Sequence, residues 1–108
     1  MPNTYKVLGQ SNPAANTATT LYTVPSSTSA VASTLTVCNL GVSTTVRVAV
    51  RPGAATLANQ HYVVYDTAVN ANDTLFFTLG LSLGAGDVVT VQAGTATVAF
   101  NLYGTEIT

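Results

Sequence analysis

Apolar and polar side chains alternate along most of the chain after Thr19. The alternation is most regular over residues 44–51, where Val46, Val48 and Val50 share one face and polar or small residues share the other. Successive side chains of a β-strand point to opposite faces, so this period predicts a strand with one buried face. The same pattern predicts seven strands after residue 18, at residues 19–24, 30–40, 44–51, 60–66, 74–83, 88–93 and 95–103.

Turn-forming residues separate the predicted strands at intervals of roughly ten residues. They include Gly41, Pro52-Gly53 and Gly94, and no stretch between them has the period of a helix. Short strands with such turns are typical of sandwiches and small barrels. We therefore predict an all-β fold, an antiparallel β-sandwich of about seven to eight strands. Its strand order, jelly-roll or immunoglobulin-like, stays open because the local pattern does not encode it.

The first residues do not share this alternation. Residues 1–17 are polar and contain Gly9 and Pro13, which predicts an extended N-terminal arm with at most one short strand at residues 5–8. Residues 18–108 form the predicted β-sandwich domain. An arm of this kind can lie on a neighbouring subunit or along its own domain, and the sequence favours neither.

The inward-facing positions of the predicted strands define one core between two sheets. Besides the three valines named above they are Leu35, Val37, Leu75, Phe77, Leu79, Leu81, Leu83, Val89, Val91, Val98, Phe100 and Leu102. Threonine dominates the opposite faces, where it keeps the β-branched shape that strands favour and presents a hydroxyl group. The surface is therefore predicted to be β-rich and nearly uncharged.

Charge is scarce: 6% of the residues are charged and the formal net charge is −1, whereas roughly 25% are charged in an average soluble protein. Three cations form no basic stripe, so nucleic-acid binding is not expected. No window holds the 18 consecutive apolar residues that a membrane-spanning helix needs. With little charge to keep copies apart, the surface favours association into an oligomer or a larger assembly.

Cysteine usage and the N-terminus bear on where the chain is made. Cys38 is the single cysteine, which leaves no internal disulfide and fits synthesis in a reducing cytosol. The polar start of the chain does not resemble a signal peptide, so we expect the mature protein to begin at or beside Met1. One histidine and four scattered carboxylates do not predict a metal site, and no cofactor is expected.

His61 is the one side chain whose ordinary pKa suits a general base, and no glycine-framed nucleophile accompanies it. We therefore predict that the protein is not an enzyme. Phe76 falls on the face opposite Leu75 and Phe77, which leaves a large aromatic ring exposed. Such a ring marks a contact surface, and we predict a subunit or partner interface that contains Phe76, Tyr65 and His61.

Arg47 and Arg51 share the outward face of one strand and are candidates for polar recognition. A guanidinium group can bind a carboxylate of a neighbouring protein or an acidic sugar. Tyr62 and Tyr65 could add hydrogen bonds and ring stacking in a carbohydrate site. A solvated face without a ligand is the alternative.

Several segments resemble small β-sandwich structural proteins of tailed bacteriophages, including cyanophages. They begin at Leu21-Tyr22-Thr23-Val24-Pro25, and further similar segments are residues 30–39, 45–50, 81–91 and 100–107. The run from Leu81 to Val91 is also similar to the jelly-roll domains of the complement-head and tumour-necrosis-factor type, which form trimers. No charged lysine follows Pro25, unlike in many similar phage segments.

The resemblance implies a non-enzymatic structural protein of the virion, in first place a capsid decoration or cement protein. Its expected partners are the major capsid protein or other virion proteins, and further copies of itself, with a trimer favoured. A protein of the tail, baseplate or fibre is the alternative within this class. A carbohydrate- or receptor-binding module is the alternative from a different class.

Overall fold

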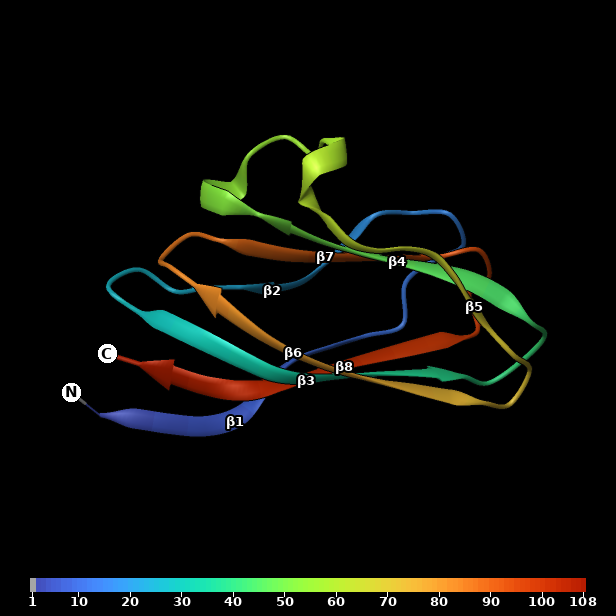
Figure 1. Cartoon of the computed structure of the whole chain (residues 1–108), viewed down its shortest axis with the longest axis horizontal. Coiled ribbons are helices and arrows are strands. Elements are labelled where there is room, and N and C mark those ends of the chain that lie inside the picture. The colour runs from blue at the N-terminus through green and yellow to red at the C-terminus, as the bar shows by residue number, and fades with distance from the viewer. Residues whose placement is uncertain (1) are drawn as a thin grey trace.

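The computed structural model of the chain describes residues 2–108 and contains two four-stranded antiparallel sheets packed face to face (Figure 1). Sheet A contains, in spatial order, β1 (Asn3–Ser11), β8 (Val98–Ile107), β3 (Ser29–Asn39) and β6 (Thr74–Leu83). Sheet B contains β2 (Thr19–Thr23), β7 (Val88–Ala93), β4 (Thr44–Arg51) and β5 (Tyr62–Val69). The predicted all-β sandwich is confirmed.

The strand order is that of a jelly roll. The first strand pairs with the eighth, the second with the seventh, the third with the sixth and the fourth with the fifth. This nested pairing is what results when one long hairpin, closed by the β4–β5 connection, is rolled over a common core. An immunoglobulin sandwich pairs its first and second strands in one sheet, whereas here β1 and β2 lie in different sheets.

Strands β4, β6 and β7 have the predicted bounds, and β2 and β3 differ by no more than one residue at either end. Strand β5 (Tyr62–Val69) begins two residues later and ends three residues later than predicted, because residues 59–61 form a 3-10 turn. Larger differences lie at the two chain ends. Strand β8 extends to Ile107 because its last residues pair with both β1 and β3. Strand β1 spans nine residues rather than four and forms an edge of sheet A. Most of the predicted arm therefore lies along its own domain, and the two termini meet where the Thr108 amide donates a hydrogen bond to the Pro2 carbonyl.

The core between the sheets contains the side chains that alternation predicted. Leu35, Val37, Val98, Phe100 and Leu102 are fully buried. The alternate residues of β6, from Leu75 to Leu81, pack against this core and are half-buried because β6 is an edge strand. Burial of these apolar side chains between two faces is the main favourable contribution to folding.

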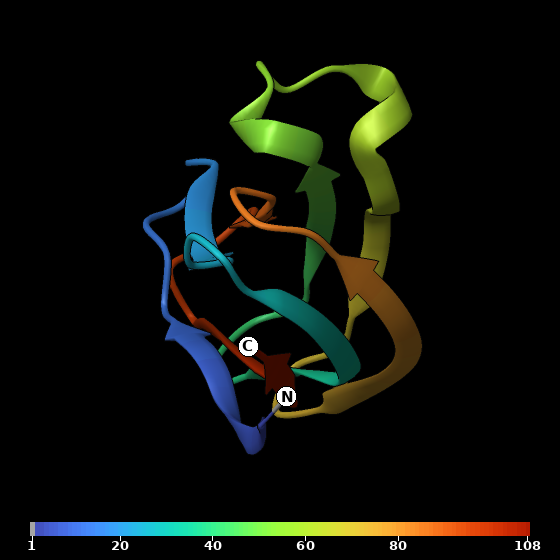
Figure 2. The ribbon, with the colours of Figure 1, turned by 90° about the vertical axis from the view of Figure 1, so that its left-hand side faces the viewer.

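The β4–β5 connection, residues 52–61, folds back over the outer face of sheet B (Figure 2). It contains two short 3-10 turns, η1 (Pro52–Ala54) and η2 (Asn59–His61). Ala49 and Thr90 point away from the core, as predicted, yet are only 1% and 6% exposed. The connection therefore covers part of this face and leaves the far end of the sheet open.

Opposite ends of the sandwich are closed by polar contacts. At one end the buried Asn39 amide donates to carbonyls of Val42, Val69 and Asn70 and accepts from Gly41 and Thr97. One side chain thus ties three loops together.

At the other end the Tyr22 hydroxyl of sheet B donates to Glu106 of sheet A at 2.6 Å, and Lys6 reaches the same carboxylate at 3.3 Å. The pKa of Tyr22 is raised, mainly by burial and next by this hydrogen bond. The same hydrogen bond lowers the pKa of Glu106.

Candidate functional site

Two irregularities of strand β5 gather four side chains on the open part of the sheet B face. Val46 and Val48 of β4 pair with Thr67 and Val64, so Arg47 alone lies opposite two residues, Tyr65 and Asp66. This is a β-bulge, and Asp66 has a left-handed φ of 51°. Bulges of this kind change the direction in which side chains point.

A second extra residue, Val63, lies between the partners of Val48 and Ala49. In a regular strand, residues three apart point to opposite faces. The extra residue places Tyr62 on the same face as Tyr65, with ring centroids 4.9 Å apart and ring planes at 79°. The two bulges therefore bring Arg47, Tyr62, Tyr65 and Asp66 together, and we call these four residues the bulge cluster.

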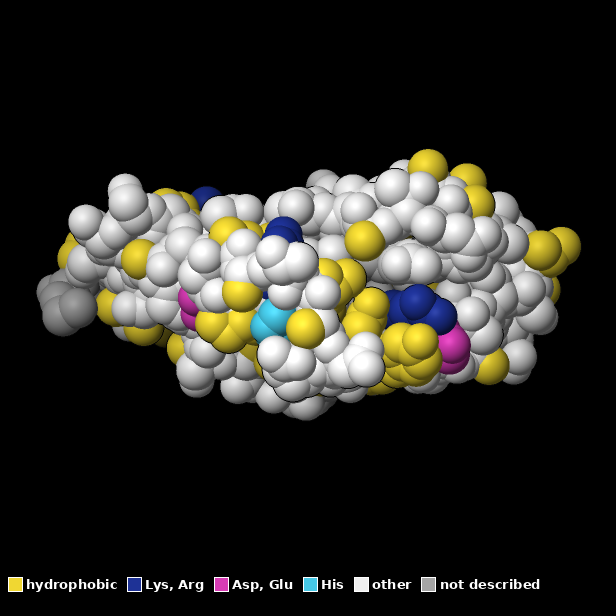
Figure 3. All heavy atoms as spheres, turned by 90° about the horizontal axis from the view of Figure 1, so that it is seen from above, with side chains coloured by type: hydrophobic (Ala, Val, Ile, Leu, Met, Phe, Trp, Pro, Cys, Tyr) yellow, Lys and Arg dark blue, Asp and Glu magenta, His cyan; other side chains and the backbone are white. Residues whose placement is uncertain are grey.

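Arg47 is held in the bulge cluster from two sides. Its Nε donates to Asp66 Oδ1 at 2.6 Å and its Nη2 to Oδ2 at 3.3 Å. Its guanidinium carbon lies 4.3 Å from the centre of the Tyr65 ring. The hydrogen bond between the two groups lowers the pKa of Asp66 and raises the pKa of Arg47, so both stay ionised near neutral pH. Figure 3 shows a basic side chain beside an acidic one on this face, with hydrophobic atoms next to them.

This pair changes what Arg47 can bind. The sequence predicted that the guanidinium would meet a carboxylate of a partner protein or an acidic sugar. Asp66 of the same chain occupies that position, and it does so because the bulge turns it toward β4. Arg47 therefore does not present an uncompensated positive charge.

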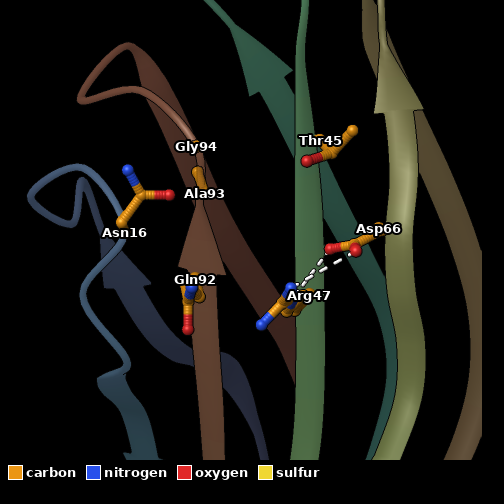
Figure 4. A pocket seen from close by; sticks show the side chains of 7 residues that line it. All are labelled: Asn16, Thr45, Arg47, Asp66, Gln92, Ala93 and Gly94. Carbon is orange, nitrogen blue, oxygen red and sulfur yellow. Dashed lines mark hydrogen bonds and ion pairs between the residues drawn. The ribbon is translucent and has the colours of Figure 1, made fainter.

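Two hollows adjoin the bulge cluster. A small polar cavity of about 40 Å³ is lined by Arg47 and Asp66 together with Asn16, Thr45, Gln92, Ala93 and Gly94 (Figure 4). An open pocket of about 360 Å³ is lined by Asn59, Tyr62 and Tyr65. The second is near the lower end of the size range of small-molecule sites.

His61 and Arg51, two further predicted interface residues, serve the fold of the β4–β5 connection. His61 is 9% exposed, and its Nδ1 accepts a hydrogen bond from the Ala58 amide at 3.0 Å. Arg51 donates to the Thr90 hydroxyl and to the Ala55 carbonyl. Both side chains hold the connection against sheet B, so they do not extend the bulge cluster.

Phe76 lies on the other side of the molecule, on the outer face of sheet A, where it is 73% exposed. The predicted exposure is confirmed, but Phe76 does not share a surface with Tyr65 and His61. The strand register places it in a row with Gln10, Asn101 and Thr36. Parallel rows contain the exposed rings and aliphatic groups of Tyr5, Val7, Val31 and Tyr103.

The outer face of sheet A is therefore broad, partly apolar and uncharged. Its outward positions on β1, β8, β3 and β6 are Tyr5, Val7, Gln10, Ala99, Asn101, Tyr103, Thr105, Val31, Thr34, Thr36, Cys38, Thr74, Phe76, Thr78 and Ser82, none of them charged. We call this surface face A.

Sequence reasoning missed Asp66 and the β1 part of face A. The alternation predicts Asp66 as the last residue of a strand, because a period of two residues does not reveal an inserted residue. The alternation of Tyr5 and Val7 with polar residues predicted a strand of four residues at most, because Gly9 and Pro13 interrupt the pattern after it. The paired positions of β1 and β8 become visible in the structure alone.

No group of three or more His, Cys, Asp or Glu side chains within residues 2–108 is placed to hold a metal ion. The same part of the chain contains no helix long and apolar enough to cross a membrane. A scan against protein-family models finds no matching family, and searches of curated proteins and of solved structures find no matching relative.

Proposed function

We propose that this chain is a non-enzymatic structural protein of a tailed-phage virion, a capsid decoration protein that attaches through face A. The observation that carries the proposal is the absence of charge from a face that exposes Tyr5, Phe76, Tyr103 and two valines. Monomeric proteins rarely expose a large apolar patch without a use for it, and such patches mark contacts with other proteins. The occupant we propose is the major capsid protein or another virion protein.

The size of face A supports a stable contact. Four strands at ordinary spacing and about nine residues of extended chain give a surface roughly 20 Å wide and 30 Å long. Standard protein interfaces bury about 800 Å² on each partner. Face A together with its edges is of that order. A contact without buried charge also avoids the desolvation that unpaired ions would cost.

The virion assignment itself is supported by the resemblance of residues 21–25, 30–39, 45–50, 81–91 and 100–107 to phage structural proteins. A jelly roll is one of the folds that capsid proteins use. Binding to the assembled shell would stabilise it by mass action, without a bond being made or broken. Attachment as a trimer, and a place on the tail rather than the capsid, remain the subsidiary proposals.

The experiment starts from purified particles of the phage that encodes the chain. Mass spectrometry is expected to find the polypeptide in the particle, and a cryo-EM map is expected to place face A against the shell. Absence of the polypeptide from the particle would contradict the virion role. Density confined to the tail would replace decoration by the tail alternative.

A variant of face A then tests whether this face binds the particle. Particles that lack the protein are incubated with wild-type chain or with Phe76→Asp, which puts a charge on the β6 side of face A. We expect the variant to bind at least about tenfold more weakly, because the contact would have to bury an unpaired carboxylate. Tyr65→Ala, which removes an exposed ring from the opposite side, is the matched control and is expected to bind like the wild type.

A further inference from the structure

We propose that the bulge cluster, with Asn59 at its rim, is a binding site for a neutral saccharide. It lies on the outer face of sheet B, on the opposite side of the molecule from face A, so it can act while face A is covered. The inference does not depend on the virion assignment. Its basis is the convergence of two aromatic rings, an ion pair and an open pocket on four residues of two strands.

The two bulges in the backbone of β5 are more than protection of a sheet edge requires. Strand β5 is an edge strand, and one bulge would be enough to stop it from pairing with another chain. It has two within five residues, and the bulge opposite Arg47 places Asp66 in a left-handed conformation. Aspartate adopts this conformation more readily than most residues do, so it suits the bulge. Edge protection accounts for a bulge, but it does not account for four side chains that converge.

The side chains match the chemistry of a sugar ring. Tyr62 and Tyr65 adjoin the pocket of about 360 Å³, and an aromatic ring offers an apolar platform with a polar tip. Arg47 and Asp66 offer planar donors and acceptors side by side, and their side chains are 30% and 46% exposed. Both bonds to Asp66 use Nε and Nη2 of Arg47, so Asp66 does not use the Nη1 donors. Adjacent hydroxyl groups of a pyranose both donate and accept, and can bond to such a pair.

The charges favour a neutral saccharide over an acidic one. Arg47 is the one cation of the bulge cluster, and the Asp66 carboxylate beside it balances its charge. A sialic acid or a sulfated sugar would bring a negative charge near Asp66 and would have to compete with it for the guanidinium. A neutral hexose has no such competition.

The test is an NMR titration of the full-length ¹⁵N-labelled chain with lactose, maltose and chitotriose, with 3′-sialyllactose as the acidic probe. We expect at least one neutral sugar to shift the amide signals of Arg47 and of residues 59–66 at millimolar concentration. We expect 3′-sialyllactose to cause smaller shifts there. No shift with any of the three neutral sugars, or shifts centred on face A, would overturn the proposal.

Variants at Tyr65 test the aromatic part. Tyr65→Ala is expected to weaken binding of the responsive sugar at least about tenfold, as the loss of an aromatic contact residue does in other interfaces. Tyr65→Phe keeps the ring and is expected to retain binding even if Tyr65→Ala is poorly folded. Phe76→Ala removes an equally exposed ring from face A and is the control, expected to bind like the wild type. Unchanged affinity in Tyr65→Ala, checked to be folded by its thermal transition, would contradict the proposal.

Asp66→Asn tests the charge balance. Asparagine accepts left-handed φ values as readily as aspartate does, so the bulge is retained. The variant leaves the charge of Arg47 unbalanced, and we expect the affinity order to reverse, with 3′-sialyllactose now preferred to the neutral sugar. An order that does not change would show that Asp66 takes no part in recognition and would refute the proposed site. Because Tyr65→Ala, Tyr65→Phe and Asp66→Asn leave face A intact, a failure here is distinguishable from a failure to bind the particle.

Discussion

The two outer faces of the sandwich differ in how far they are covered and in chemistry, although both belong to four-stranded antiparallel sheets with register shifts. Face A carries threonine, amide and aromatic side chains and no charge, and its sheet has register shifts at Leu8 and Ser33. The sheet B face is covered at one end by residues 52–61, and at the other end it has two bulges and the Arg47–Asp66 pair. Its exposed rings lie beside a small polar cavity and an open pocket.

This difference shows how one fold separates two kinds of surface. Between its register shifts, face A presents equivalent positions in rows, which suits contact with another extended protein surface. A bulge breaks the equivalence and lets residues that are three and four apart meet at one point. We infer that face A suits an extended contact with another protein, and that the bulge cluster suits recognition of a small chemical group.

The largest effect is expected where the sheet B face is covered. Ala49→Asp would put a carboxylate without a partner under residues 52–61, because Ala49 is 1% exposed. We expect a loss of about 3–5 kcal/mol in the free energy of unfolding. Ala99→Asp, at an outward position of the central strand β8 in sheet A, is the matched change and is expected to cost about 1 kcal/mol.

Urea denaturation of both variants measures this contrast. Similar losses in the two variants would mean that residues 52–61 do not shield Ala49 in solution. The comparison of a covered face with an open one would then fail, whatever face A binds.

Period two was enough to predict the sheets, because each core strand buries one face and exposes the other. It predicted the burial of Leu35, Val37 and Phe100 and the exposure of Phe76. It could not predict the pairing of β1 with β8, since partners so distant in sequence leave no local signal. It also could not predict the bulge cluster, because an inserted residue shifts the phase that the prediction assumes.

The buried Asn39 was missed for a related reason. Its position continues the inward series of Leu35 and Val37, where a polar residue contradicts the apolar pattern. Its partners are loop carbonyls and a threonine hydroxyl, which come near only after the strands have packed.

An intermediate effect is expected for the contact that joins the two sheets. Tyr22→Phe removes the hydrogen bond from sheet B to Glu106 of sheet A, and we expect a loss of about 1.5 kcal/mol, because the acceptor is charged. The Tyr22 ring itself remains, so its packing in the core is kept. Urea denaturation measures the loss, and a Tyr22→Phe variant as stable as the wild type would contradict a contribution of this bond.

The pH dependence of this bond follows from two pKa shifts. The pKa of Glu106 is lowered from 4.5, so the stability that the bond contributes is complete above that value and is lost as the pH falls through the lowered pKa. The pKa of Tyr22 is raised from 10.0, so its contribution is complete below that value and is lost as the pH rises beyond it. The difference between wild type and Tyr22→Phe should be constant between about pH 5 and 9 and shrink outside this range.

A small effect on stability is expected from Phe76→Ser on face A. Phe76 is 73% exposed, so the free energy of unfolding should change by less than about 0.5 kcal/mol. The apparent mass in sedimentation at high concentration should fall or stay at that of a monomer, because an apolar ring that favours association has been removed. A loss of stability of the size expected for Ala49→Asp would mean that face A is part of the folding core.

The smallest effect on stability is expected from Asp66→Asn in the bulge cluster. The Arg47–Asp66 pair is exposed, and solvent and salt screen such pairs. The urea midpoint should differ slightly from wild type at low ionic strength and coincide with it at high ionic strength.

The pKa of Asp66 is lowered, so the stability that the pair contributes is lost as the pH falls below 3.8, in the same direction as for Glu106. A midpoint that fell strongly and regardless of salt would make the pair a structural element of β5, and the reason to regard the bulges as a recognition site would be removed. A variant that unfolds like the wild type while its sugar preference reverses would establish that this part of sheet B is arranged for a ligand.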